Sequence, residues 1–127
     1  MTKKSEPDKR IFRNDENCPV RNVVAQISDR WSMLVLFALV DGPDRFNALK
    51  RRVERISQKM LTQTLRDLER EGYVNRTVYP EVPVRVEYAL TELGRALIGP
   101  LYGLVSWADD NHAAIRQCRE NYDRAHC

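Results

Sequence analysis

Basic side chains are concentrated in one short stretch of this 127-residue chain. Seven lysines and arginines lie between Arg45 and Arg66, where Glu54 is the single acid. The stretch carries a net charge of +6, whereas the whole chain carries only +3, so the remaining residues are net negative. Cationic side chains gathered on one face bind phosphate groups. The sequence therefore predicts one anion-binding face on an otherwise nearly neutral protein.

The second part of this stretch has the pattern of an amphipathic helix from Ser57 to Glu71. Leu61, Leu65 and Leu68 recur at spacings of four and three, which places them on one inward face. Serine is a favourable N-cap, so the helix is expected to begin at Ser57. The opposite face carries cationic and hydrogen-bonding side chains, namely Lys59, Thr62, Gln63, Arg66 and Arg70, with Gln58 beside them.

These side-chain types are the ones that read DNA. Glutamine pairs with adenine, a threonine methyl contacts a thymine methyl, and lysine or arginine binds guanine or phosphate. Basic residues of the preceding segment, including Arg52, are placed to grip the DNA backbone, and those of a following hairpin can lie along a neighbouring groove. The predicted DNA-binding set is Lys50, Arg51, Ser57, Gln58, Lys59, Thr62, Gln63, Arg66, Arg76 and Arg85.

Helices and a hairpin must position these residues, and the hydrophobic pattern predicts both. Apolar spacing and the N-cap residues Asp29, Ser57 and Thr91 indicate four helices, then a proline-interrupted pair of alternating strands, then a long helix in which Gly99-Pro100 is the place for a kink. This order is typical of a winged helix-turn-helix, a mainly α fold with a small β-hairpin wing. Trp31, Phe37, Phe46 and Tyr88 are interpreted as core residues, with a small-molecule pocket as the alternative. The expected ranges are 19–27, 31–40, 46–53, 57–71, 73–79, 85–90 and 91–122.

Length and composition predict one domain and exclude several classes of protein. At 127 residues and 43% apolar content, the chain suits a single core, with an arm at 1–16, a domain at 17–122 and a tail at 123–127. The longest apolar run, Met33 to Val40, is too short to span a bilayer, and no signal segment is evident, so we expect a cytoplasmic protein. Nucleotide-binding and nucleophile motifs are absent, as is any metal-ligand spacing, so no enzyme, cofactor or metal is expected.

Most of the chain, from Cys18 to Trp107, resembles the HxlR-type winged-helix regulators of bacteria, which are related to the MarR group. The most specific matches are Tyr79-Pro80-Glu81-Val82-Pro83 and Val86-Glu87-Tyr88 in the expected wing. One departure is Ser28-Asp29-Arg30-Trp31, where the family commonly has Gly-Gly-Lys-Trp. Further matches are Cys18-Pro19-Val20, Asp41-Gly42-Pro43-Asp44-Arg45-Phe46-Asn47-Ala48-Leu49, Ile56-Ser57-Gln58-Lys59-Met60-Leu61-Thr62-Gln63, Leu65-Arg66-Asp67-Leu68-Glu69 and Leu90-Thr91-Glu92-Leu93-Gly94.

The resemblance implies a homodimeric transcription factor that binds double-stranded operator DNA. Dimers of this type pair through the first helix and the long C-terminal helix. The residues agree, because Leu97, Leu101, Leu104 and Val105 continue an apolar stripe beyond what a small winged core needs to cover. We therefore expect a homodimer that places two recognition helices in successive major grooves.

Cys18 is the residue that we expect to carry a regulatory switch. It comes just before the first helix, where backbone N–H groups favour a thiolate, and Arg21 follows one turn later. In the family that the chain resembles, a cysteine at this place often senses electrophiles or oxidants, and oxidation can link it to a C-terminal cysteine of the other subunit. Cys118 or Cys127 would be that partner here.

The sequence is compatible with two other hypotheses about function. One is a regulator of the same fold that is gated by a small aromatic ligand without thiol chemistry. The other is a protein-interaction module that uses the fold without DNA, although the basic face of the Ser57–Glu71 helix argues against it.

Overall fold

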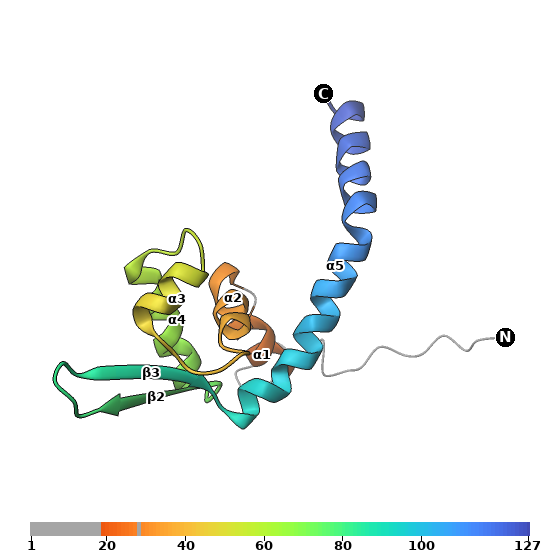
Figure 1. Ribbon diagram of the computed structural model, residues 1–127. Helices are drawn as coiled ribbons and strands as arrows, with labels where there is room; N and C mark the ends of the chain where they lie inside the picture. The colour runs from red at the N-terminus through yellow and green to blue at the C-terminus, as the bar shows by residue number, and fades with distance from the viewer. Residues whose placement is uncertain (1–18, 28) are drawn as a thin grey trace.

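The computed structural model describes residues 19–27 and 29–127, so the expected arm at 1–16 and Cys18 lie outside the described residues. Five helices and three short strands make up this part of the chain (Figure 1). They follow in the order α1 (Pro19–Ile27), α2 (Arg30–Ala38), β1 (Asp44–Arg45), α3 (Phe46–Arg52), α4 (Gln58–Arg70), β2 (Val74–Tyr79), β3 (Arg85–Leu90) and α5 (Glu92–Ala125). The order confirms the predicted winged helix-turn-helix.

Helix α2 is the centre of the core, as its apolar sequence predicts. Val35, Leu36 and Leu39 are completely buried there, and the inward leucines of α4 pack against this helix. Trp31, Phe37, Phe46 and Tyr88 are half-buried and pack around the rim of the same core. In the described part of the chain, the buried apolar residues are Val35, Leu36, Leu39, Leu49, Val53, Ile56, Leu61, Leu65, Leu68, Tyr73, Val74, Leu90, Ile98 and Leu101.

Asp29 begins α2 as its N-cap, as the sequence predicts. Its Oδ1 accepts hydrogen bonds from the backbone N–H groups of Trp31 and Ser32 at 2.8 and 2.7 Å, and its Oδ2 accepts one from the Ser32 hydroxyl at 2.6 Å. Burial opposes ionisation of this carboxyl, but the three hydrogen bonds outweigh burial and hold its pKa below the usual range. The aspartate is therefore an ionised cap that fixes the start of the central helix.

The wing is a three-stranded antiparallel sheet rather than the two-stranded hairpin that we expected. β3 lies between β2 and the two-residue strand β1, with Asp44 opposite Tyr88 and Arg45 opposite Glu87. On its other side β3 pairs with β2 over six residues, from Val74–Leu90 to Tyr79–Arg85. Because β1 leads directly into α3, its pairing with β3 connects the start of that helix to the sheet of the wing.

Helix α5 is a continuous helix of 34 residues, which Thr91 caps by accepting a hydrogen bond from the N–H of Gly94. It passes through Pro100 without interruption and extends to Ala125, so the residues from 123 that we assigned to a tail are largely helical. Its first turns pack on the core, where Ile98 and Leu101 are buried, Leu97 lies beside them and the ring of Tyr102 lies 4.9 Å from that of Phe37. Figure 1 shows the remainder projecting well beyond the winged core.

Candidate nucleic-acid interface

The best candidate for a functional surface is the outer face of α4. Ser57 caps this helix, with its hydroxyl oxygen accepting a hydrogen bond from the N–H of Met60 at 3.0 Å. Leu61, Leu65 and Leu68 are at most 1% exposed, so the inward stripe is confirmed and the helix is anchored along its length. This anchoring fixes which side chains face away from the core.

The predicted reading residues lie together on that outer face. Gln58, Lys59, Thr62, Gln63 and Arg66 line one shallow hollow of about 480 Å³. The Thr62 hydroxyl donates to the carbonyl of Gln58 at 2.8 Å, and Gln63 Nε2 donates to Asp67 Oδ1 at 3.0 Å. Gln63 keeps its carbonyl oxygen and a second N–H for another partner, which is the donor–acceptor pair that recognises adenine.

The basic end of α3 divides into two kinds of residue. Lys50 and Arg51 are exposed in its last turn, and the structure places no ion-pair partner on either among the described residues. Arg52 instead pairs with Asp44 at 3.3 Å and donates to the carbonyl of Ala38 at 2.9 Å. Arg52 therefore has a structural role between α2, α3 and β1, whereas Lys50 and Arg51 remain available to a phosphate backbone.

The two arginines of the wing also differ. Arg85 lies over the ring of Tyr79, 4.0 Å from its centroid, and pairs with Glu81 at 3.2 Å and Glu87 at 3.4 Å. Its charge is neutralised within the wing and it does not join the α4 surface. Arg76 is exposed on β2 and faces α4.

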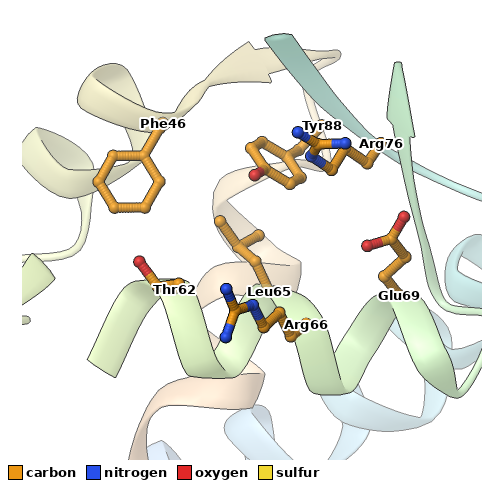
Figure 2. Close-up of a pocket in the computed structure, with 7 residues that line it drawn as sticks. All are labelled: Phe46, Thr62, Leu65, Arg66, Glu69, Arg76 and Tyr88. Atoms are coloured by element: carbon orange, nitrogen blue, oxygen red, sulfur yellow. The ribbon is translucent and has the colours of Figure 1, made fainter. Parts of the chain in front are cut away.

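A second hollow, of about 360 Å³, joins the wing to α4 (Figure 2). Arg66 and Arg76 both line it, so the structure brings these two predicted residues together. The sequence did not predict that these residues meet in one site, because Phe46 and Tyr88 were interpreted as core residues, with a small-molecule pocket as the alternative, and Glu69 was not expected near Arg66 and Arg76. The strand register supplies the missing signal, since it places Tyr88 directly opposite Arg76. The lining residues are Phe46, Thr62, Leu65, Arg66, Glu69, Arg76 and Tyr88.

The cysteines lie away from this surface where they can be placed. Cys118 and Cys127 are exposed free thiols at the projecting end of α5, and Cys18 is not among the described residues. The described part of the chain contains no group of three or more potential metal ligands. None of its helices has the length and apolar content needed to cross a membrane.

These features define a winged helix-turn-helix DNA-binding protein: α4 is capped and amphipathic, α3 before it is basic, and the β wing adjoins both helices. The HxlR-like helix-turn-helix family model matches residues 26–116. The chain therefore belongs to this family of transcriptional regulators and is not an enzyme.

Individual proteins support the same assignment. An HTH-type transcriptional regulator of Methanothermobacter thermautotrophicus is 51% identical over 90 residues, which cover 71% of this chain and 69% of that protein. The solved structure of the transcriptional regulator ytfH from Salmonella typhimurium is 42% identical, covers 84% of this chain and 95% of its own, and has a TM-score of 0.73. The solved structure of the redox regulator HypR in its reduced form is 37% identical to this chain. The match covers 78% of this chain and 98% of the HypR chain, and the TM-score is 0.73.

Proposed function

We propose that this regulator binds an operator as a homodimer, with the outer face of α4 in the major groove. The observation that carries this proposal is the gathering of Lys59, Thr62, Gln63 and Arg66 in one hollow of an anchored helix. Lys50 and Arg51, which are exposed in the last turn of α3, supply contacts to the DNA backbone beside it. Gln63 is the best candidate for base recognition because its amide retains a donor and an acceptor.

The apolar surface of α1 and α5 supports the homodimer. Large apolar side chains are exposed to solvent along both helices, which is unfavourable for a monomer and is typical of a protein–protein interface. On α5 they continue beyond the last turn that packs on the core, onto the projecting part of Figure 1. A second copy of the chain would cover this surface around a twofold axis. The exposed residues are Val23, Val24, Leu93, Tyr102, Leu104, Val105, Trp107 and Tyr122.

Fluorescence anisotropy on the DNA upstream of the regulator's own gene tests DNA binding. We expect a linear dependence of log affinity on log salt, with a slope of about −0.9 for each phosphate contacted. Gln63→Ala should weaken operator binding by about tenfold and reduce the preference over a scrambled duplex. Arg124→Ala, at the far end of α5, is the matched surface control and should change neither quantity. Affinity that ignores both salt and sequence would disprove the proposal.

We also propose that oxidants or electrophiles switch the regulator through Cys18. The similarity to HypR, whose reduced and oxidised forms are both similar to this chain, supports a redox response. Cys118 and Cys127 are exposed free thiols, which supports one of them as the disulfide partner that we propose for Cys18 of a second subunit.

Single serine variants of the three cysteines test the switch. Cys18→Ser should bind operator as the parent protein does and no longer respond to diamide. If Cys118 is the partner, Cys118→Ser should remove the covalent dimer from a non-reducing gel, whereas Cys127→Ser should retain it. A Cys18→Ser protein that still releases DNA under diamide would remove Cys18 from the mechanism, and release by a small aromatic compound would favour ligand gating instead.

A further inference from the structure

The hollow between the wing and α4 is lined by residues from four elements, which are α3, α4, β2 and β3. Phe46 comes from the first turn of α3, and Arg76 and Tyr88 come from paired positions of β2 and β3. The α4 residues Thr62, Leu65, Arg66 and Glu69 lie along one side of that helix. Its position at the edge of the α4 reading surface is evident because Thr62 and Arg66 line both hollows. A ligand in this hollow would therefore lie directly beside the DNA bases that the outer face of α4 is proposed to contact.

The charges of the hollow favour an anion. Arg66 enters from α4 and Arg76 from β2, so two guanidinium groups meet the space from different walls (Figure 2). Within the described residues neither arginine has a carboxylate within 4.0 Å, in contrast to Arg85, which has two. Glu69 is the single acid of the lining and leaves a net charge of +1. Two arginines that line one hollow, and that have no ion-pair partner in the described part of the chain, can both donate charge-assisted hydrogen bonds to a phosphate held there.

The remaining wall is apolar and carries one hydroxyl that is free to donate. The rings of Phe46 and Tyr88 and the side chain of Leu65 form this wall. Tyr88 is half-buried, and Figure 2 shows its hydroxyl directed into the hollow. Among the described residues its hydroxyl has no hydrogen-bond partner. A ligand that combines an anionic group with a ring that has carbon-bound faces would contact both the arginines and the apolar wall.

We propose that this hollow holds one deoxyribose-phosphate unit of the DNA strand that flanks the major groove read by α4. Arg66 and Arg76 bridge the phosphate, Tyr88 donates a hydrogen bond to it, and Phe46 packs against the sugar. This inference rests on the proposed function and changes the role of one residue in it. Arg66 contacts the backbone rather than a base, so its contribution does not depend on sequence.

Salt-dependent binding by Arg66→Ala, Arg76→Ala and the double variant tests whether the two arginines share one phosphate. Each single variant should weaken binding by about tenfold, to the operator and to a scrambled duplex alike. The double variant should flatten the salt slope by about 0.9, the value for one phosphate. Flattening by about 1.8 would show two separate phosphates and overturn the proposal. Loss of affinity confined to the operator would show that Arg66 reads a base, with the same consequence.

Conservative variants of the other lining residues extend the test. Tyr88→Phe should lose about two- to tenfold in affinity on both duplexes with an unchanged salt slope, because a neutral donor is removed. Glu69→Gln should tighten binding to both duplexes, since it removes an anion that faces the phosphate. Weaker binding of Glu69→Gln to the operator alone would show that Glu69 accepts from a cytosine amino group, which would overturn the assignment of the hollow to the backbone.

The failure of this inference can be told apart from failure of the proposed function. If Gln63→Ala weakens operator binding while Arg66→Ala and Arg76→Ala bind as the parent protein does, the reading helix stands and the phosphate site falls. If the parent protein itself binds no duplex, the proposed function falls. Thermal unfolding of each variant shows whether it is folded, and both arginines are exposed, so little change in Tm is expected.

Discussion

Arg76 and Arg85 lie on paired strands of the same wing, but their surroundings give them different capacities to bind DNA. Both were predicted to lie along a DNA groove, because residue type alone cannot show where a neighbour's carboxylate falls. The fold brings Glu81 and Glu87 to Arg85 and leaves Arg76 facing α4. Sequence reasoning therefore identified the cations of the site and could not identify which of them would be neutralised.

We expect Arg85→Gln to change the salt slope of DNA binding by much less than 0.9, because its charge is already compensated within the wing. Conversely, the Glu81→Gln, Glu87→Gln double variant frees Arg85 and should steepen the slope. Anisotropy titrations in a salt series measure both effects. A slope that falls by about 0.9 in Arg85→Gln would show that DNA displaces the two glutamates and takes Arg85 as a contact.

Gly94 is a residue whose substitution should be costly for a local steric reason. A Cβ at this position would overlap the carbonyl oxygen of Tyr73 and approach Leu90 Cδ2 at 3.3 Å. That carbonyl cannot easily move, since it accepts the N–H of Thr91 at 3.1 Å. Gly94→Ala should therefore lower stability by about 1–3 kcal/mol, measured by urea unfolding. In Gly103→Ala, where a Cβ meets nothing within 4 Å, stability should stay the same or rise by up to about 1 kcal/mol.

At the scale of elements, the local signals were sufficient for the helices and the hairpin but not for β1. The caps at Asp29, Ser57 and Thr91 all lie where the sequence places them. Asp44–Arg45 is too short to show any alternation and is a strand only because β3 pairs with it. The hollow at Phe46 and Tyr88 was not predicted, since it depends on how the hairpin packs against α3 and α4, which local patterns do not encode.

The cap of α2 should make stability depend on acid pH. The pKa of Asp29 is lower in the folded protein than in the unfolded chain, so the folded state binds fewer protons there. Its contribution is complete above the unfolded pKa, about 3.9, and is lost as pH falls through the folded value. Asp29→Asn should therefore reduce the change in Tm between pH 5 and pH 2, measured by circular dichroism. An unchanged pH dependence would show that Asp29 contributes no linkage.

The same cap has a separate contribution at neutral pH. Asp29→Ala removes the acceptors of both backbone N–H groups and should cost about 1 kcal/mol at pH 7. Asp29→Asn retains an acceptor oxygen and should cost less, which separates the hydrogen bonds of the cap from its charge.

At the scale of the whole molecule, a single chain leaves large apolar side chains of α5 exposed to solvent. Its reading helix presents a single small face, and its longest helix projects away from the core with exposed Leu104 and Trp107 (Figure 1). The two features are complementary, because a dimer through α5 would both cover the apolar surface and duplicate the basic one. Composition alone could not reveal this, since a net charge of +3 conceals a local +6 that a twofold axis would present twice.

Leu104→Glu should separate dimerisation from folding. Leu104 is 53% exposed in one chain, so the substitution should leave a monomer folded, whereas burying the carboxylate between two copies would be strongly unfavourable. We expect a monomeric mass by light scattering and a weaker, single-site interaction with DNA. Gln117→Glu adds the same charge at another exposed position of α5 and is the control for a general effect of charge.

Operator spacing provides the sharpest test of the dimer, because a twofold pair of recognition helices requires half-sites about one helical turn, or 34 Å, apart. Inserting about five base pairs between the half-sites rotates one to the opposite side of the duplex, and the parent protein should then bind with the affinity of a single half-site. An insertion of about ten base pairs restores the facing but doubles the separation, so a rigid dimer should lose affinity there as well. Leu104→Glu should be indifferent to both insertions. If the parent protein binds both lengthened operators as tightly as the original one, its two recognition helices are not rigidly joined through α5.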